Sequence, residues 1–355
     1  MHKNFSIQNV SAYAVYMIPL LLLTGPAIPD IVVSFASMCF IYILISNNDY
    51  KFIFNTFSYI FFIFCIYLIF SSLISQQPIF SLQSSLFYFR FGLLSLLVWY
   101  LIEKQENFMR YFLYFLVIAF LIALFSGIYQ YIFSETIFGK QPQANRLLLL
   151  ASDNEALGQW LSRLFPLLVA LMMYNFKPKV SYYLVIFFLL IGIDTLVYLS
   201  GERTSLGLMF VSSIFIIVLM KKLRLFRIIT IFFSVLIIIL ISIYNPEIKE
   251  RNVDYTITQL GLDDKNEKIN LFSPLHENYI MTSLSIFEKN KVFGVGPNNY
   301  RHFCGKNEHG IDHRSCSTHP HHNYIQVLAE TGIIGFLFIM LTIIYLTFLV
   351  FKYIY

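Results

Sequence analysis

Residues 221–244 read KKLRLFRIITIFFSVLIIILISIY, with four basic side chains in the first seven residues and an apolar run after them. The run is close to the ~20 residues that a helix needs to cross a bilayer. Lys and Arg concentrate in the short cytoplasmic loops of membrane proteins. The basic cluster therefore predicts that this helix starts on the cytoplasmic side, and that the chain after residue 244 lies on the outer side.

The composition of the whole chain agrees with a membrane protein. Of its 355 residues, 57% are hydrophobic and only 13% are charged, against roughly 25% charged residues in soluble domains. Apolar runs long enough to span a bilayer lie near 8–25, 28–46, 52–74, 86–102, 111–133, 156–174, 180–200, 204–221, 224–244 and 332–352. We therefore predict an all-α polytopic membrane protein with about ten transmembrane helices. The net charge of +5 reflects topology signals and gives no reason to expect nucleic acid as a partner.

The order of these runs predicts three parts. Residues 1–244 hold nine transmembrane helices, residues 245–331 form one large outer loop subdomain, and residues 332–355 form the last transmembrane helix. The first apolar run is expected to remain as an uncleaved span, because the TGPAIPD that follows it is a poor cleavage site.

Several ionisable side chains fall inside or at the ends of the predicted spans. Such groups are costly at membrane depth and are usually functional. Arg90, Arg163 and Asp194 lie within spans, and Glu155 and Arg203 lie at span ends. On the predicted topology they belong to the outer half of the membrane, where we expect them to line a polar pocket under the long loop.

Six of the eight histidines gather shortly before the last span. They are His302, His309, His313, His319, His321 and His322. One interpretation is a zinc site shared with Cys304 and Cys316, although the spacing fits no common paired-ligand pattern. A second is a solvated loop. The third, which we favour, is an acid–base role for one histidine at the start of the last helix, because imidazole exchanges protons near neutral pH.

The four cysteines divide by location. Cys39 and Cys65 lie inside apolar runs, where small core residues are expected. Cys304 and Cys316 lie in the polar loop, where an oxidising compartment would permit a disulfide that closes a loop of about a dozen residues, worth roughly 3 kcal/mol. Metal ligation is the alternative for this pair.

Two short motifs lie near helix ends. Residues 200–203, SGER, separate two predicted spans, and a guanidinium at a helix N-terminus favours anionic oxygens such as those of a diphosphate. A turn with an interfacial anchor is the alternative, and Arg146 admits the same two interpretations. Residues 294–299, GVGPNN, lack the flanking strand and the Gly-Lys-Ser/Thr of a nucleotide loop, so they predict a turn.

Four stretches resemble hallmarks of the O-antigen ligase and O-antigen polymerase superfamily. Residues 318–335, THPHHNYIQVLAETGIIG, resemble its His-Asn step and its Leu-Gln-x-x-x-Glu-x-Gly-x-x-Gly helix entry. Residues 200–206 resemble its Ser-Gly-x-Arg helix start, residues 293–297 its Gly-x-Gly-Pro turn, and residues 145–166 its Asn-Arg segment. The resemblance extends from about residue 140 onward.

The sequence departs from this family in two places. Aligned on Gln326 to Gly332, the family's histidine falls on His321, and His322 replaces the usual Asn, Ser or Gln. An alignment on His322 and Asn323 restores the His-Asn pair with a shift of one residue; we prefer His321 because the downstream helix fits better. The chain also has one span after the loop, where the family usually has more.

The resemblance implies a metal-independent glycosyltransferase of the bacterial inner membrane, with its active site facing the periplasm and with no cofactor. It passes a glycan from undecaprenyl diphosphate to an acceptor hydroxyl. The most expected activity is that of an O-antigen ligase, with lipid A-core as the acceptor. An O-antigen polymerase and a protein O-oligosaccharyltransferase are alternatives. A membrane transporter is the alternative from another class, and it should show discontinuous helices and an inverted repeat.

The resemblance and the residue chemistry together assign the roles. His321, or His322 in the other register, is expected to act as the catalytic base. Arg203 and Arg146 are expected to hold the diphosphate. Lesser roles in substrate binding are expected for Arg90, Arg163, Arg301 and His276.

Overall fold

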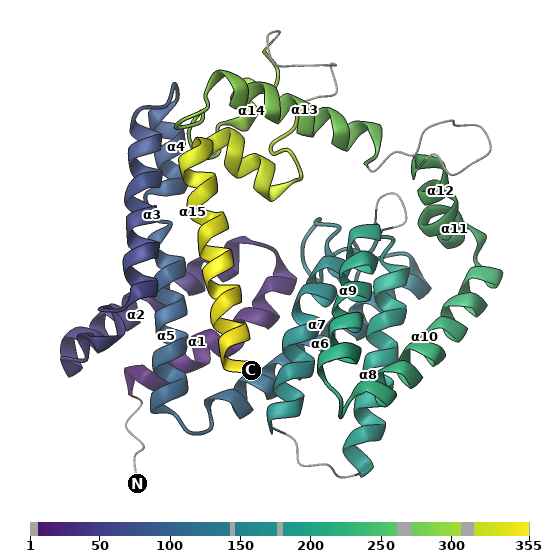
Figure 1. The fold of residues 1–355 in the computed structure, drawn as a ribbon. Coiled ribbons are helices and arrows are strands. Elements are labelled where there is room, and N and C mark those ends of the chain that lie inside the picture. The colour runs from purple at the N-terminus through teal and green to yellow at the C-terminus, as the bar shows by residue number, and fades with distance from the viewer. Residues whose placement is uncertain (1–5, 143–145, 176–179, 261–271, 307–315, 355) are drawn as a thin grey trace. The chain divides into compact units, whose positions relative to one another are not determined.

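The computed structural model describes residues 6–142, 146–175, 180–260, 272–306 and 316–354. Every regular element in these ranges is a helix, and none is a strand. Figure 1 shows the helices in chain order. They group into two compact units. Unit 1 comprises residues 1–43 and 97–257, and unit 2 comprises residues 44–96 and 258–355.

Eight helices in the described ranges are long and apolar enough to cross a membrane. They are Ile7–Thr24, Ala27–Asn47, Thr56–Leu73, Pro78–Lys104, Phe108–Phe133, Leu157–Asn175, Arg224–Tyr244 and Asn323–Lys352. Two shorter apolar helices, Tyr183–Leu199 and Arg203–Leu219, fall on the seventh and eighth predicted spans. The chain is therefore a multi-pass, all-helical membrane protein, as predicted. Each of the ten predicted runs falls on a helix, and eight of them have the length and hydropathy of a span.

Unit 1 is built around a bundle of α6 to α10. Its elements are α1 (Ile7–Leu21), η1 (Leu22–Thr24), most of α2 (Ala27–Asn47), the end of α5 (Phe89–Lys104), α6 (Phe108–Phe133), α7 (Leu157–Asn175), α8 (Val180–Leu199), α9 (Arg203–Leu219), α10 (Arg224–Tyr244), α11 (Pro246–Lys249), the π-helical turn η3 (Glu250–Asp254) and the start of α12 (Tyr255–Leu260). Phe120, Phe165 and Val197 are fully buried in its apolar core. α7 packs against α6, α8 and α9 and so lies at the centre of the bundle.

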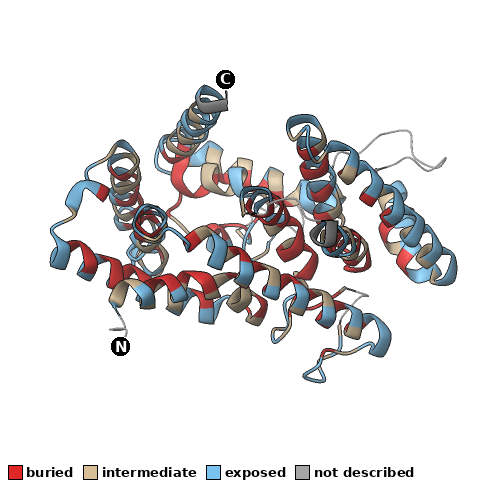
Figure 2. Ribbon diagram, turned by 90° about the horizontal axis from the view of Figure 1, so that it is seen from below, coloured by how far each residue is buried: buried red, intermediate tan, exposed pale blue. Residues whose placement is uncertain are grey.

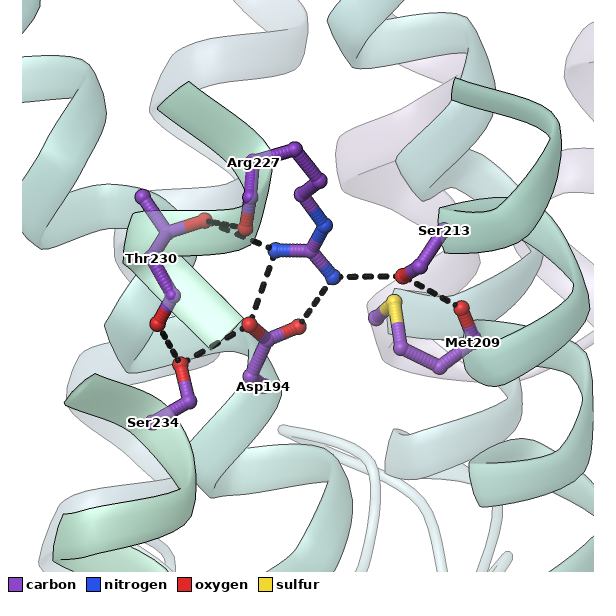
Figure 3. Close-up of polar contacts among 6 residues, drawn as sticks. All are labelled: Asp194, Met209, Ser213, Arg227, Thr230 and Ser234. Carbon is purple, nitrogen blue, oxygen red and sulfur yellow. Dashed lines mark hydrogen bonds and ion pairs between the residues drawn. The ribbon is translucent and has the colours of Figure 1, made fainter. Parts of the chain in front are cut away.

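A buried ion pair ties α8, α9 and α10 together (Figure 3). The Nη1 and Nη2 atoms of Arg227 donate to the two carboxylate oxygens of Asp194, each at 2.8 Å. Nη2 also donates to Ser213 at 2.7 Å, and Ser234 donates to Asp194 at 2.9 Å. The side chains of the pair are only 2% and 9% exposed. Each charge is thus neutralised and hydrogen-bonded, as burial at this depth requires.

The ion pair corrects two interpretations of the sequence. The sequence places Arg227 in the basic cluster at the cytoplasmic end of its span, but its guanidinium is buried inside the bundle. The sequence predicts that Asp194 lines a polar pocket, but its carboxylate pairs with Arg227 in the core. Both follow from the cost of an unpaired charge among apolar helices, which is lowest when the two charges meet.

Unit 2 contains the remaining helices. They are the end of α2, the 3₁₀ turn η2 (Tyr50–Phe52), α3 (Thr56–Leu73), α4 (Pro78–Ser85), the start of α5, the end of α12, α13 (Pro274–Lys289), α14 (Tyr300–Phe303) and α15 (Asn323–Ile354). α13 packs on α15. Ile286, Tyr300 and Ala329 are fully buried between these elements.

The turn at residues 294–299 and the start of α15 approach each other at their backbones. The N–H of Gly296 donates to the carbonyl of Glu330 at 2.8 Å. Gly294 and Gly332 have φ values of 68° and 64°, and a β-carbon on either would overlap the backbone of the facing segment. Glycine is therefore needed at both positions. Gly332 also breaks the regular geometry of α15 where the last span was predicted to begin.

Most helices carry buried residues on one side and exposed residues on another (Figure 2). Many of the exposed side chains are large and apolar, such as Phe232 on α10 and Phe348 on α15. In the 18-residue apolar stretch that makes α15 long and apolar enough to cross a membrane, only 6% of the residues are buried. Apolar surfaces of this kind are uncommon on soluble monomers and are expected where helices face lipid.

Candidate active site

The SGER motif forms a sharp connection between α8 and α9 in unit 1. Gly201 has a φ of 68°, the left-handed conformation that commonly ends a helix, and its N–H donates to Tyr198 at 3.2 Å. Glu202 is extended, and α9 begins at Arg203. The two antiparallel helices thus turn within three residues. This places Arg203 at the first position of α9, where the helix dipole adds to its positive charge.

The carboxylate of Glu202 reaches across to the start of α7. It accepts the N–H of Gly158 at 2.9 Å and the hydroxyl of Ser205 at 3.1 Å. Gly158 permits this approach, because a β-carbon there would overlap the hydroxyl of Ser200. Burial raises the pKa of Glu202, while its hydrogen bonds and Arg146 oppose the shift. Glu202 therefore joins the N-terminal ends of α7 and α9.

Three guanidinium groups gather at these two helix ends. Arg251, from η3, donates from Nε to the carbonyl of Gly201 at 3.1 Å. Burial and the charges of Arg146 and Arg203 lower the pKa of Arg251. Arg146 forms an ion pair with Glu155 at 3.4 Å. We name Arg146, Arg203 and Arg251 the arginine cluster.

Two groups of the arginine cluster have unused hydrogen-bonding capacity. Within the ranges that the structure describes, Arg203 has no hydrogen-bond or ion-pair partner, and the buried Nε of Arg146 donates to no acceptor. Like-charged groups held together at helix N-termini attract an anion with several oxygens. The arrangement therefore suits a phosphate or diphosphate group.

A cavity of about 820 Å³ adjoins the arginine cluster in unit 1. Arg146 and Arg163 line it together with the amides of Asn154 and Gln159. Two carboxylates, Asp153 and Glu155, and apolar side chains such as Trp160 also line it. Its size and its mixed lining are typical of sites for small or medium-sized ligands.

The second group of candidate residues lies in unit 2, around His321. Its ring centroid lies 4.2 Å from that of His319, 5.3 Å from that of Tyr279 and 5.8 Å from that of His276. Ser317 Oγ lies 3.5 Å from its Nε2 atom. Loss of solvation, followed by the charges of His319 and His276, lowers the pKa of His321. A lowered pKa keeps the imidazole in its neutral form, which is the form that accepts a proton.

The backbone at the histidine motif separates His321 from His322. His321 has a φ of 54°, a left-handed conformation that is uncommon outside glycine but enriched in His and Asn. His322 comes directly before α15, and its Nδ1 accepts the N–H of Ile325 at 3.3 Å. His322 thus caps the helix with one ring nitrogen, whereas His321 faces α13.

The five predicted arginine ligands are divided between the two units. Arg146 and Arg203 belong to the arginine cluster, and Arg163 lines the adjoining cavity. Arg90 and Arg301 belong to unit 2. There Arg301 donates to Asn298 at 2.8 Å, and the guanidinium of Arg90 lies 4.7 Å from the ring centroid of its neighbour Phe91.

Cys304 and Cys316 form a disulfide with a Cα–Cα separation of 4.8 Å. Their sulfurs are therefore engaged with each other. Cys39 and Cys65 are free and buried. His309 and His313 lie outside the described residues. In the described ranges, no group of three or more His, Cys, Asp or Glu side chains is arranged to hold a metal ion.

Sequence reasoning missed Arg251 and the bridging role of Glu202. A signal for Arg251 was present, because on the predicted topology it is a basic residue soon after the outer end of a span, where Lys and Arg are less common. No comparable signal marks Glu202 as the partner of Gly158, which lies 44 residues away in the chain.

Comparison with known families bears on the same residues. Residues 185–340 match the family described as O-antigen ligase. The matched part contains Arg203, Arg251 and His321. A comparison with curated proteins found no match. The family match confirms the resemblance seen in the sequence motifs and indicates a glycosyltransferase-like enzyme. Residues 185–340 of the chain are therefore similar to the O-antigen ligase family.

Proposed function

We propose that this protein transfers a glycan from undecaprenyl diphosphate to an acceptor hydroxyl, as an O-antigen ligase does. The observation that carries the proposal is the arginine cluster at the adjoining N-termini of α7 and α9. A lipid diphosphate carries several anionic oxygens on a leaving group. Guanidinium groups bind such oxygens in a two-pronged geometry that a lysine cannot reproduce.

The proposed reaction breaks the bond between the anomeric carbon and the diphosphate oxygen and forms a bond to the acceptor oxygen. Negative charge develops on the departing diphosphate, and fixed positive groups stabilise it most in the transition state. We assign this role to Arg203 and Arg146, with Arg251 beside them. The proposal includes no metal, because the guanidinium groups supply the positive charge.

We assign His321 as the base that removes the proton of the acceptor hydroxyl. The neutral imidazole takes the proton as the hydroxyl oxygen attacks, a contribution of roughly 10²- to 10⁴-fold. Its lowered pKa favours that neutral form, and its ring nitrogens do not cap a helix as His322 Nδ1 does. The helix-capping role of His322 supports the register in which His321 is the base.

Glycan transfer by purified protein from a lipid-diphosphate donor tests the proposal. Arg203→Lys keeps the charge and removes the fork, so we expect the rate to fall by about 10²-fold. Lys222→Arg is the matched control, because Lys222 is exposed at the opposite end of the bundle, before α10. Full activity of Arg203→Lys would contradict diphosphate binding by this residue.

The acceptor is tested by the glycan of a deletion strain. We propose lipid A-core as the acceptor, at the periplasmic face of the inner membrane. A ligase predicts a core without O-chain while lipid-linked polymer accumulates. A core with a single repeat would indicate a polymerase instead, and loss of glycan from proteins alone would indicate a protein oligosaccharyltransferase.

A further inference from the structure

α15 consists of two helical segments that meet at Gly332. This residue has a φ of 64° and a ψ of −168°, which lie far from the values of an α-helix. We name residues 323–331 the first segment and residues 333–354 the spanning segment. Backbone groups that are freed at such a break need new partners when they are buried. The partners found here decide how firmly the two segments are held.

The first segment carries the histidine motif at its start. His321 lies two residues before it, and the carbonyl of His322 accepts the N–H of Gln326 at 2.9 Å. The segment is about 13 Å long at 1.5 Å per residue, so a tilt of about 5° at its far end moves the histidine end by about 1 Å. A displacement of about 1 Å can lower a rate by about 10²-fold. The break therefore controls how well His321 is placed.

The chain that leads into the turn at 294–299 supplies partners for the backbone at the break. In a regular helix the N–H of Ile333 donates to the carbonyl of Ala329, four residues earlier. Here it donates to the carbonyl of Lys291 at 2.8 Å, and the carbonyl of Ala329 accepts the N–H of Val295 at 3.1 Å. Both groups are thus hydrogen-bonded in the broken geometry.

Tyr67, from α3, bonds to both sides of the break. Its hydroxyl donates to the carbonyl of Thr331, and the N–H of Gly335 is a hydrogen-bond partner of the same hydroxyl. Thr331 and Gly335 are four residues apart, so in a regular helix these two backbone groups bond each other. The Tyr67 hydroxyl therefore joins the first segment to the spanning segment.

Two buried serines attach the turn itself to the helices beside it. Ser71, one turn after Tyr67 on α3, donates to the carbonyl of Phe293 at 3.0 Å. Ser81, on α4, donates to the carbonyl of Pro297 at 2.8 Å. Both side chains are fully buried, where a hydroxyl needs a partner. The turn is therefore bonded to α3 and α4 as well as to α15.

We propose that Tyr67 is a positioning residue for the transfer reaction, because it sets the angle between the two segments of α15 and with it the place of His321. Ser71 and Ser81 act with it by holding the turn. Tyr67 touches no reacting group and lies before the residues that match the family, 185–340. This inference rests on the proposed function, because it takes His321 to be the catalytic base.

Glycan transfer by variants at position 67 tests the proposal. Tyr67→Phe removes the hydroxyl and keeps the ring. We expect kcat to fall by about tenfold or more, while the KM for the lipid-diphosphate donor and the melting temperature stay at the parent values. p-Aminophenylalanine at this position restores a donor to the carbonyl of Thr331 and should restore kcat.

Tyr59→Phe is the matched control, because Tyr59 lies on the same helix and is 55% exposed. A kcat of Tyr67→Phe equal to that of Tyr59→Phe would overturn the proposal, as would a loss that p-aminophenylalanine does not reverse. If Tyr67→Phe does not fold, Ser71→Ala takes its place. It should also lower kcat at an unchanged donor KM, and an unchanged kcat would count against the proposal.

The distance between two spin labels tests the geometry without any substrate. The labels are placed on cysteines at Tyr324, in the first segment, and at Met281, on α13, which are both exposed, in a variant that lacks the two free cysteines. We expect Tyr67→Phe to broaden the distribution of distances, because the first segment can then tilt. A distribution that does not change would overturn the proposal.

The two experiments separate this inference from the proposed function. A distribution broadened by Tyr67→Phe, in a protein that transfers no glycan, would overturn the proposed function and leave the role of Tyr67 at the break standing. Glycan transfer by the wild-type protein, with kcat and distances unchanged in Tyr67→Phe, would do the opposite.

Discussion

His321 and His322 are adjacent in the chain, but their imidazoles have different surroundings. His321 lies against His319 and Tyr279 with a left-handed backbone, and His322 caps α15 through Nδ1. Asn suits both positions structurally, because it tolerates positive φ and caps helices well. Replacing either histidine with Asn therefore removes its imidazole and keeps a residue that suits the backbone conformation at that position.

We expect His321→Asn to lower glycan transfer by roughly 10²- to 10⁴-fold, the loss typical of a missing general base. His322→Asn should retain most of the activity, because Asn replaces the helix cap. Both variants should keep the melting temperature of the parent, measured in detergent. Loss of activity in His322→Asn with an active His321→Asn would move the base to His322.

The pH dependence of the reaction offers a second test of His321. Its pKa is lowered from 6.5, so the neutral base form persists below that pH, and the rate should decline only as His321 is protonated. His319→Asn removes one of the positive charges that lower this pKa. The pKa of His321 should rise, and the acid limb of kcat/KM should move to higher pH. An acid limb that does not move would exclude this coupling.

At the scale of elements, the Asp194–Arg227 pair fixes how α8, α9 and α10 meet. Arg227→Met leaves the Asp194 carboxylate buried and unpaired, which should cost about 3–5 kcal/mol of unfolding free energy. Asp194→Leu combined with Arg227→Met removes both charges and should recover most of that loss. Thermal unfolding in detergent measures the difference.

Lys222→Met is the matched control for the ion pair, because it removes a basic side chain that is exposed and lies just before the same helix. If Arg227→Met is as stable as Lys222→Met, the pair contributes little to the bundle. Failure of the double variant to recover would instead assign the loss to the hydroxyl contacts of Ser213 and Ser234.

At the scale of the whole molecule, the structural features that could be predicted from the sequence are those that depend on the local pattern of residues. Each of the ten predicted apolar runs falls on a helix, and the stretch at 294–299 was correctly predicted as a turn. The pattern could not show that Arg227 is buried, since a basic residue near the start of a span has the same local sequence whether it faces water or Asp194. Contacts between residues far apart in the chain, such as Glu202 and Gly158, depend on how the helices pack, which the local sequence pattern does not predict.

Membrane topology can be tested from contacts within unit 1. Glu202 meets Gly158, and Arg251 meets Gly201, so the starts of α7 and α9 and the segment after α10 share one end of the bundle. The basic residues between α9 and α10 lie at the other end. α9 has 17 residues, roughly 25 Å at 1.5 Å per residue, which is close to the ~30 Å thickness of the hydrocarbon core.

We therefore expect α9 to cross the membrane although it is short, with the arginine cluster on the outer face. In a variant without the free Cys39 and Cys65, a cysteine at Lys249 should react with a membrane-impermeant maleimide in intact cells. A cysteine at Lys222 should react only after permeabilisation, because the basic cluster holds its loop inside. If both cysteines react from outside, Lys222 and Lys249 lie on the same side of the membrane, and α10 does not span it. If only the cysteine at Lys222 reacts from outside, the arginine cluster lies in the cytoplasm, away from a periplasmic acceptor.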